Sequence, residues 1–147
     1  MLFEMHCHTS RHSRCSNADP IDCVKRAVAM GLDGLLVTEH GYLWEDEELE
    51  ELKKTAEIDS DFVVLSGQEI ATEVGHILVY GAHKSIRNNI SVQELRMEYP
   101  SAALVWAHPW RRSASPSEKR LAHPALDAIE IFNKNHTHRE NYEALIT

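Results

Sequence analysis

The stretch GLLVTEH, residues 34–40, is a continuous apolar run that ends in a carboxylate and an imidazole. A short unbroken run of this kind is typical of a strand buried on both faces, as in a parallel sheet. A well-marked helix precedes it, with Asp19 as N-cap, Pro20 at the first helical position and Gly31 at the end. These three residue types are favoured at those positions. The stretch therefore predicts a buried strand that follows a helix.

The alternation of helix and strand continues along the chain. A strand is expected before His6, and further strands are expected over 62–65, 76–81, 103–107 and 128–132. Helices are expected over the acidic stretch to about residue 58, from 91 to 98 after a capping-box pattern, and from 139 onward. This alternation predicts an α/β architecture with a mainly parallel sheet.

Length and charge limit the class of protein. With 147 residues, 43% of them hydrophobic, the chain is expected to form a single domain, residues 1–147, with its own core. The formal net charge of −8 argues against duplex-DNA binding. Apolar runs stay shorter than the roughly 18–20 residues of a membrane span, so we expect a cytoplasmic protein without membrane contact. The oligomeric state does not follow from the sequence. The three cysteines are interpreted as reduced thiols.

Histidines and carboxylates follow most of the expected strands. They are His6 and His8, Glu39 and His40, Glu69, and His108. The carboxyl ends of parallel strands share one face, so these side chains are expected to converge. His6 and His8 lie two residues apart and would point to the same side of a strand. Imidazoles with a carboxylate are ligands of zinc, manganese and iron, which predicts a metal site.

Other polar residues leave alternatives open. His76 opens an expected strand rather than closing one, and His12 lies in a polar loop that could fold back over the site. Both could instead have a structural role. Arg111 and Arg112 follow His108 and could bind a phosphate through paired hydrogen bonds, or lie in a solvated loop. Trp110 could stack on a base or pack in the core.

Five motifs occur in an order that resembles the PHP family (polymerase and histidinol phosphatase domains). They are His6-x-His8-Thr9, 31–34 leading to 38–40, 67–70 with 75–78, 107–109, and 129–133. The resemblance extends from about residue 3 to 133. It implies a distorted seven-stranded α/β barrel, similar to a TIM barrel, that holds two or three divalent metal ions (Zn, Mn or Fe) and hydrolyses phosphoester bonds.

The resemblance also implies roles for single residues. His6 and His8 would hold one ion, which Glu69 would bridge to a second ion held by His76 and His108. His40 would belong to a third site, and His12 occupies the region of another ligand of that site. Apart from the resemblance, we expect Glu69 and His40 to be the catalytic residues and Arg111 and Arg112 to bind the substrate.

The sequence departs from the family at its end. Members typically close with a seventh strand that carries a Gly-Ser-Asp-x-His-like element, and this sequence stops at Thr147 before such a segment. We therefore expect a barrel that lacks its last strand, in a domain that is incomplete at its C-terminus.

The leading hypothesis is a metal-dependent phosphoesterase. Its substrate would be a phosphate ester of a small metabolite, nucleotide or short oligonucleotide, attacked by a metal-activated water. Two alternatives stay open. An amidohydrolase-like enzyme that cleaves C–N bonds would use similar ligands without needing the arginines, and a non-catalytic metal-binding domain would fit the absent closing motif.

Overall fold

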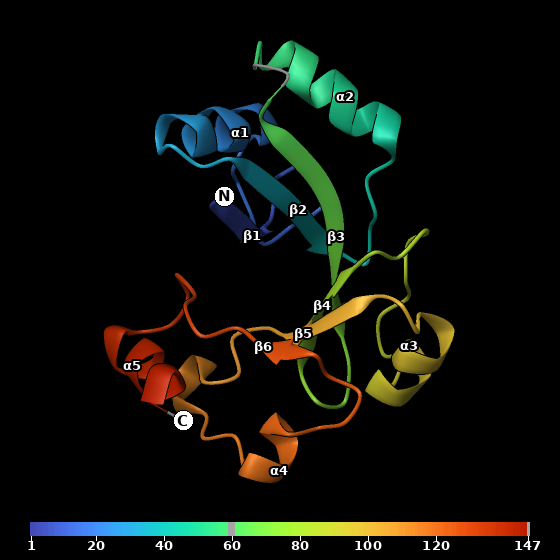
Figure 1. The fold of residues 1–147 in the computed structure, drawn as a ribbon, viewed down its shortest axis with the longest axis vertical. Coiled ribbons are helices and arrows are strands. Elements are labelled where there is room, and N and C mark those ends of the chain that lie inside the picture. The colour runs from blue at the N-terminus through green and yellow to red at the C-terminus, as the bar shows by residue number, and fades with distance from the viewer. Residues whose placement is uncertain (59–60, 147) are drawn as a thin grey trace. The chain divides into compact units, whose positions relative to one another are not determined.

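The structure is a computed structural model that describes residues 1–58 and 61–146. Its strands are β1 (Phe3–Cys7), β2 (Gly34–His40), β3 (Val63–Ala71), β4 (His76–Tyr80), β5 (Ala103–Trp106) and β6 (Ala128–Ile129). Its α-helices are α1 (Pro20–Ala29), α2 (Asp46–Thr55), α3 (Val92–Glu98), α4 (Glu118–Leu121) and α5 (His138–Ile146), and a 3₁₀ turn, η1, spans Arg111–Ser113 (Figure 1).

The chain divides into two compact units. Unit 1 comprises Met1–Glu69 and Ala82–Ile86, and unit 2 comprises Ile70–Gly81 and Arg87–Thr147. Strand β3 begins in unit 1 and its last two residues belong to unit 2. Each unit has its own set of helices and strands.

Unit 1 contains the parallel pairs β1–β2 and β2–β3. The second pair is in register from Gly34 opposite Val63 to His40 opposite Glu69. Glycine is required at position 34, because a Cβ there would lie 2.7 Å from the backbone oxygen of Val63 and 2.2 Å from a ring carbon of Phe3. The sequence prediction of a strand buried on both faces is confirmed, since residues 34–39 are all buried.

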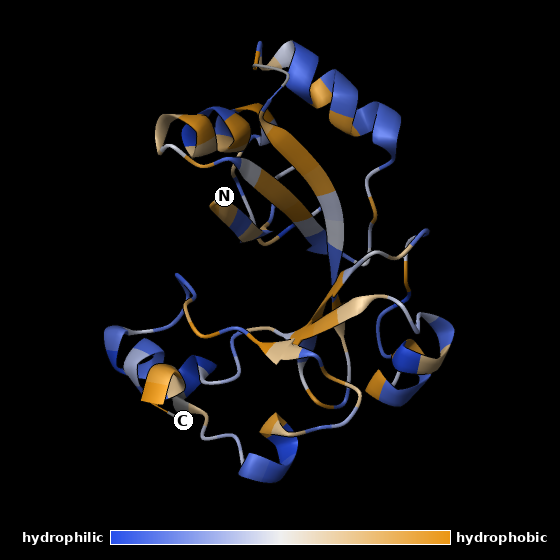
Figure 2. Cartoon of the chain, in the orientation of Figure 1, coloured by the Kyte–Doolittle hydropathy of each residue, from blue (hydrophilic) through white to orange (hydrophobic). Residues whose placement is uncertain are grey.

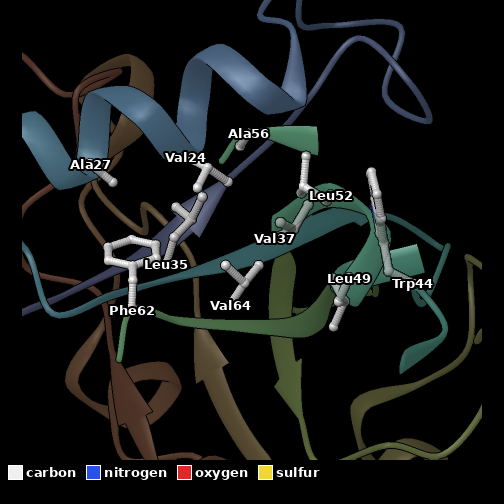
Figure 3. Close-up of a cluster of buried hydrophobic side chains, with 10 residues drawn as sticks. All are labelled: Val24, Ala27, Leu35, Val37, Trp44, Leu49, Leu52, Ala56, Phe62 and Val64. Atoms are coloured by element: carbon white, nitrogen blue, oxygen red, sulfur yellow. The ribbon is translucent and has the colours of Figure 1, made fainter. Parts of the chain in front are cut away.

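Helices α1 and α2 supply the other half of the core of unit 1. Figure 3 shows Val24 and Ala27 of α1 beside Leu35 of β2, with Leu52 of α2 nearby. The α1 boundaries confirm the sequence prediction, because the Asp19 side chain accepts a hydrogen bond from the N–H of Ile21. Figure 2 shows β2 and β3 as largely hydrophobic, whereas α2 is mostly hydrophilic with single apolar positions. The acidic run is thus the solvated side of an amphipathic helix.

Unit 2 contains the antiparallel pair β4–β5 and the short parallel pair β5–β6. Helix α3 begins with the predicted capping box, in which Ser91 accepts from the N–H of Glu94 at 3.1 Å. Arg96 of α3 donates to the carbonyl of Ala125 and to the carboxylate of Asp127, so it ties the helix to the segment before β6.

The predicted seven-stranded barrel is wrong. The strands form an open, mixed, six-stranded sheet in the order β1 to β6. The sheet is mixed because Ala71 and His76 are joined by a tight turn, in which Thr72 N–H donates to Gly75 O at 2.9 Å. A parallel crossover needs a dozen or more residues, which this turn lacks. The last strand is also shorter than expected, with two residues in place of five.

Within the described part of the chain, no helix is both long and apolar enough to cross a membrane.

The carboxylate of Asp127 should make the stability of the protein depend on pH. The backbone N–H of Leu104 and the guanidinium of Arg96 hold the pKa of Asp127 below its usual value. A lowered folded-state pKa stabilises the fold above the unfolded-state value of about 3.9, and the effect is lost as the pH falls through the folded-state value. Asp127→Asn should therefore lower the free energy of unfolding at pH 7 and have a smaller effect near pH 3, measured by urea denaturation.

Glu50→Gln is a matched control, because Glu50 is an exposed carboxylate of α2. Equal losses of stability for Asp127→Asn at both pH values would contradict the pH dependence.

Candidate functional site

Three imidazoles converge on one carboxylate in unit 1. The Nε2 atoms of His6 and His8 lie 3.1 Å apart. One oxygen of Glu69, Oε2, lies 3.0 Å from Nε2 of His8 and 3.1 Å from Nδ1 of His40, and its other oxygen lies 3.7 Å from Nε2 of His6. The Glu69 side chain is 2% exposed. Four potential metal ligands predicted from the sequence are thus brought together.

Strand pairing places these four residues. The continuous parallel register of β2 and β3 places His40 opposite Glu69 near the carboxyl ends of both strands. The end of β1 is held against β2 by Thr38, whose hydroxyl accepts from the N–H of Cys7 at 3.0 Å. His6 and His8 flank Cys7, so the alternation of side chains points both imidazoles toward the same side.

A buried carboxylate, Glu39, holds the loop that follows β1. Glu39 is fully buried, and it accepts hydrogen bonds from the N–H and the hydroxyl of Thr9, from the hydroxyl of Ser13, and from Nε1 of Trp44. Burial of a charged group is tolerated only when such bonds replace its hydration. Glu39 therefore fixes the backbone from which His8 projects.

Ser13 also sets the proton of His8. Its hydroxyl donates its single proton to Glu39, accepts from the N–H of His40 at 3.2 Å, and lies 3.4 Å from Nδ1 of His8. With its proton committed, that hydroxyl can only accept from His8. We infer that His8 carries its proton on Nδ1 and presents a lone pair at Nε2.

The donor set fits a divalent cation. Nε2 of His8 lies about 3 Å from a carboxylate oxygen of Glu69 and about 3 Å from an imidazole nitrogen of His6. Electron-rich atoms this close repel one another unless a proton or a cation lies between them. Neutral imidazoles whose other nitrogen donates to an oxygen, together with a carboxylate, are the usual ligands of zinc and iron.

His12 lies elsewhere. Its ring stacks on Tyr42 with centroids 3.7 Å apart, and its Nε2 is 3.9 Å from Glu48. Tyr42 in turn donates to Glu48 at 2.9 Å, and this bond raises the pKa of Tyr42. His12 therefore contacts Tyr42 and Glu48. It belongs to neither of the two groups of potential metal ligands found among the described residues.

A second constellation lies in unit 2. The rings of His76 and His108 have centroids 5.3 Å apart. Both histidines line a pocket of about 410 Å³ together with Arg111, Arg112 and Arg120. The pocket therefore combines two imidazoles with three guanidinium groups.

Backbone contacts hold this pocket. The N–H of His108 donates to Glu130 at 2.7 Å, and Nδ2 of Asn133 donates to the same carboxylate at 2.9 Å. His108 and Arg112 both have positive φ, 34° and 61°. Such values are uncommon for residues other than glycine and recur at functional sites.

Several site features were not predicted from the sequence. Cys15 lies with its Sγ 3.3 Å from Nε2 of His40, although no motif singled it out. Arg120 has its guanidinium 5.0 Å from the ring centroid of Trp106, and it donates to the carbonyl of Val74. The acidic neighbour in the Thr38-Glu39-His40 motif was a signal for Glu39, whereas the loop positions of Cys15 and Arg120 carried none.

Burial decides between the two interpretations of Trp110. Trp110 is 4% exposed, and it does not line the pocket, so the packing alternative holds. His136 is also buried, at 7% exposed, and its Nδ1 lies 3.0 Å from Asn141.

Glu39→Gln should destabilise the protein. The amide of glutamine brings two donors into a position where donors already point, so at least one group of Thr9, Ser13 or Trp44 loses its acceptor. An unsatisfied buried group costs about 1–3 kcal/mol. Thermal and urea denaturation should show a loss of that size. Glu57→Gln, at an exposed position, is the control, and equal stability of the two variants would contradict the role of Glu39.

A search of solved structures finds a likeness that extends over nearly the whole chain. A crystal structure from Bifidobacterium adolescentis, of a protein named "putative metal-dependent phosphoesterase", matches with a TM-score of 0.69 and 15% sequence identity, over 98% of this chain and 82% of that one. No protein-family model matches the sequence. No curated protein matches it. At 15% identity the likeness shows a shared fold, and membership of the PHP family stays a prediction.

Proposed function

We propose that the protein is a metal-dependent phosphoesterase that hydrolyses a phosphate ester of a small metabolite, nucleotide or short oligonucleotide. The observation that carries this proposal is the convergence of His6, His8 and His40 on the buried carboxylate of Glu69. The fold shared with a protein named for metal-dependent phosphoesterase activity supports it, as does the resemblance of the motifs to the PHP family.

His6, His8 and Glu69 would hold a divalent ion in unit 1, and His76 and His108 are proposed as metal ligands in unit 2. Zinc, manganese and iron suit these donors. Such ions, when bound, would supply an activated water that attacks a phosphorus centre near neutral pH. They would also supply positive charge that offsets the charge of the phosphoryl oxygens.

The residues of the chain have further tasks. Ser13 and Glu39 orient His8, as described above. The pair formed by Glu69 Oε2 and His40 Nδ1, at 3.1 Å, can hold a proton on Nδ1 of His40. We propose Glu69 and His40 as catalytic residues on this basis, because both touch the position where an ion would bind.

The pocket of unit 2 is suited to an anion. Arg111, Arg112 and Arg120 bring three permanent positive charges to a space of about 410 Å³. Guanidinium groups bind phosphate through paired hydrogen bonds. The volume suits a small ester. With a net charge of −8 over the whole chain, local arginines are the means by which an anionic substrate is attracted.

This pocket favours phosphoester over C–N bond hydrolysis. An amide or a cyclic amide carries no charge that calls for three arginines. A non-catalytic metal-binding domain would likewise have no use for an arginine-lined pocket beside two imidazoles. The arginines are thus the feature that separates the leading function from its two alternatives.

The proposal is tested with the purified chain. Bound metals are counted by mass spectrometry, and hydrolysis is measured with p-nitrophenyl phosphate, bis-p-nitrophenyl phosphate and a set of amides, before and after removal of metal with a chelator. We expect bound transition metal and hydrolysis of the esters alone, lost on chelation and restored by zinc or manganese. A chain that binds no metal, or that hydrolyses amides but no ester, would overturn the proposal.

Ser13→Ala should weaken metal binding without removing a ligand. The variant loses the acceptor that orients His8, and loss of such a supporting contact typically costs about 10–100-fold in metal affinity. Competition with a chromophoric chelator measures the affinity for zinc. Ser10→Ala, at an exposed position of the same loop, is the control. Unchanged affinity in Ser13→Ala would refute this supporting role.

Arg111→Ala should raise KM for the ester more than it lowers kcat. A hydrogen bond to a charged group contributes about 1.5–3 kcal/mol, and each 1.4 kcal/mol is about tenfold, so KM should rise at least about tenfold. Steady-state kinetics with a phosphate monoester provide the measurement. Arg139→Ala removes an exposed arginine of α5 that pairs with Glu143, and it should leave KM unchanged. The same KM in both variants would exclude a substrate-binding role for Arg111.

A further inference from the structure

We infer that Cys15 is a metal ligand, and that with His40 it forms a thiolate-containing site for a soft divalent ion such as zinc. One ligand atom each of Cys15, His40 and the neighbouring His8 lies within 4.8 Å of the other two. All three belong to unit 1. The inference rests on the proposed function in one respect, because it places this ion beside the ligand group of Glu69.

The two nitrogens of His40 face different partners. Nδ1 lies 3.1 Å from Glu69 Oε2, whereas Nε2 lies 3.3 Å from the sulfur of Cys15. A histidine that binds a metal commonly donates its other ring N–H to a carboxylate, which fixes the tautomer and makes the ligand more basic. Glu69 is placed to do this for His40. The lone pair of Nε2 is then directed toward Cys15.

The separation of these two atoms matches two ligands of one ion. With bond lengths of about 2.3 Å to sulfur and 2.0–2.1 Å to nitrogen and tetrahedral angles, the sulfur and the nitrogen would lie about 3.5 Å apart. The observed distance is 3.3 Å. His8 stacks on His40 with ring centroids 4.5 Å apart, and it also faces Glu69, so it lies where the two ligand groups meet.

The loop that carries Cys15 is tied to the strand ends. The N–H of Ser13 donates to the carbonyl of Thr9, the N–H of Ser16 donates to the carbonyl of Ser13, and the hydroxyl of Ser16 donates to the carbonyl of His8 at 2.9 Å. These bonds hold the loop over the imidazoles. The position of the thiol therefore follows from the backbone, although Cys15 itself is exposed.

A thiolate ligand changes the metal preference of the site that contains Cys15 and His40. Sulfur ligands select soft and borderline ions, whereas carboxylates and water suit manganese and magnesium. The site formed by Cys15 and His40 should thus retain zinc when manganese is in excess. Two protein ligands leave the other positions of a tetrahedral ion open for water or substrate.

Cobalt substitution of the full chain tests the inference. Metal-free protein is titrated with Co²⁺, and a thiolate ligand gives an intense sulfur-to-cobalt charge-transfer band in the near ultraviolet. We expect this band in the wild-type protein and in Cys23→Ala, whose thiol lies on α1. We expect its loss in Cys15→Ala and in Cys15→Asp. Cys15→Ala should also bind fewer equivalents of zinc, and Cys15→Asp should keep the full number.

Alkylation of the folded wild-type chain gives a second readout that needs no variant. Zinc should slow the modification of Cys15 by iodoacetamide at least tenfold, followed by mass spectrometry of the Cys15 peptide, and leave the rate at Cys23 unchanged. An equal rate at Cys15 with and without zinc would contradict the inference.

The outcomes separate this inference from the proposed function. A wild-type chain that binds zinc and hydrolyses esters without showing the band overturns the role of Cys15 and leaves the function standing. A Cys15-dependent band without ester hydrolysis supports the ligand and overturns the function. A chain that binds no metal overturns both.

Discussion

The continuous parallel register between β2 and β3 is the constraint on which the candidate site depends. It sets His40 beside Glu69 at the carboxyl ends of two buried strands, and β1 then adds His6 and His8 along the same edge. A shift of one residue in either strand would turn its ligand to the opposite face of the sheet. The register is protected by the core beneath it, because the apolar side chains of β2 pack against α1 and α2. The strands that form the core of unit 1 therefore also position the ligands.

A buried charge links that core to the site. Glu39 is an expensive residue to bury, and its cost is offset by donors from Thr9, Ser13 and Trp44. The same bonds fix the loop after β1 and commit the proton of Ser13, which favours the tautomer of His8 that is protonated on Nδ1. The carboxylate therefore acts on the chemistry of the site without touching a substrate. A neutral residue at this position would leave the imidazoles present and the loop unsupported.

Periodicity and strand-end residues predicted the part of the fold that depends on local rules. The α1 cap, the buried β2 and the capping box of α3 follow from residues adjacent in sequence, and the structure has each of them. The barrel was not predicted correctly, because its closure depends on how strands pair. The turn from Ala71 to His76 and the two-residue β6 are features that apolar runs do not reveal. Likewise, the convergence of His6, His8, His40 and Glu69 follows from their positions at strand ends. The positions of Cys15 and His12 depend on loop conformation, which hydrophobic periodicity does not predict.

The charge balance of the unit 1 cluster would suit a bound cation. The chain has a net charge of −8, and the unit 1 cluster adds a buried carboxylate to imidazoles that approach within 3.1 Å of one another. Contacts this short between imidazole nitrogens and a carboxylate require a proton or a cation between the atoms. A divalent cation would interact favourably with the carboxylate and with every nitrogen lone pair at once. Its binding would therefore stabilise the β1–β3 edge through the linkage that couples metal binding to folding.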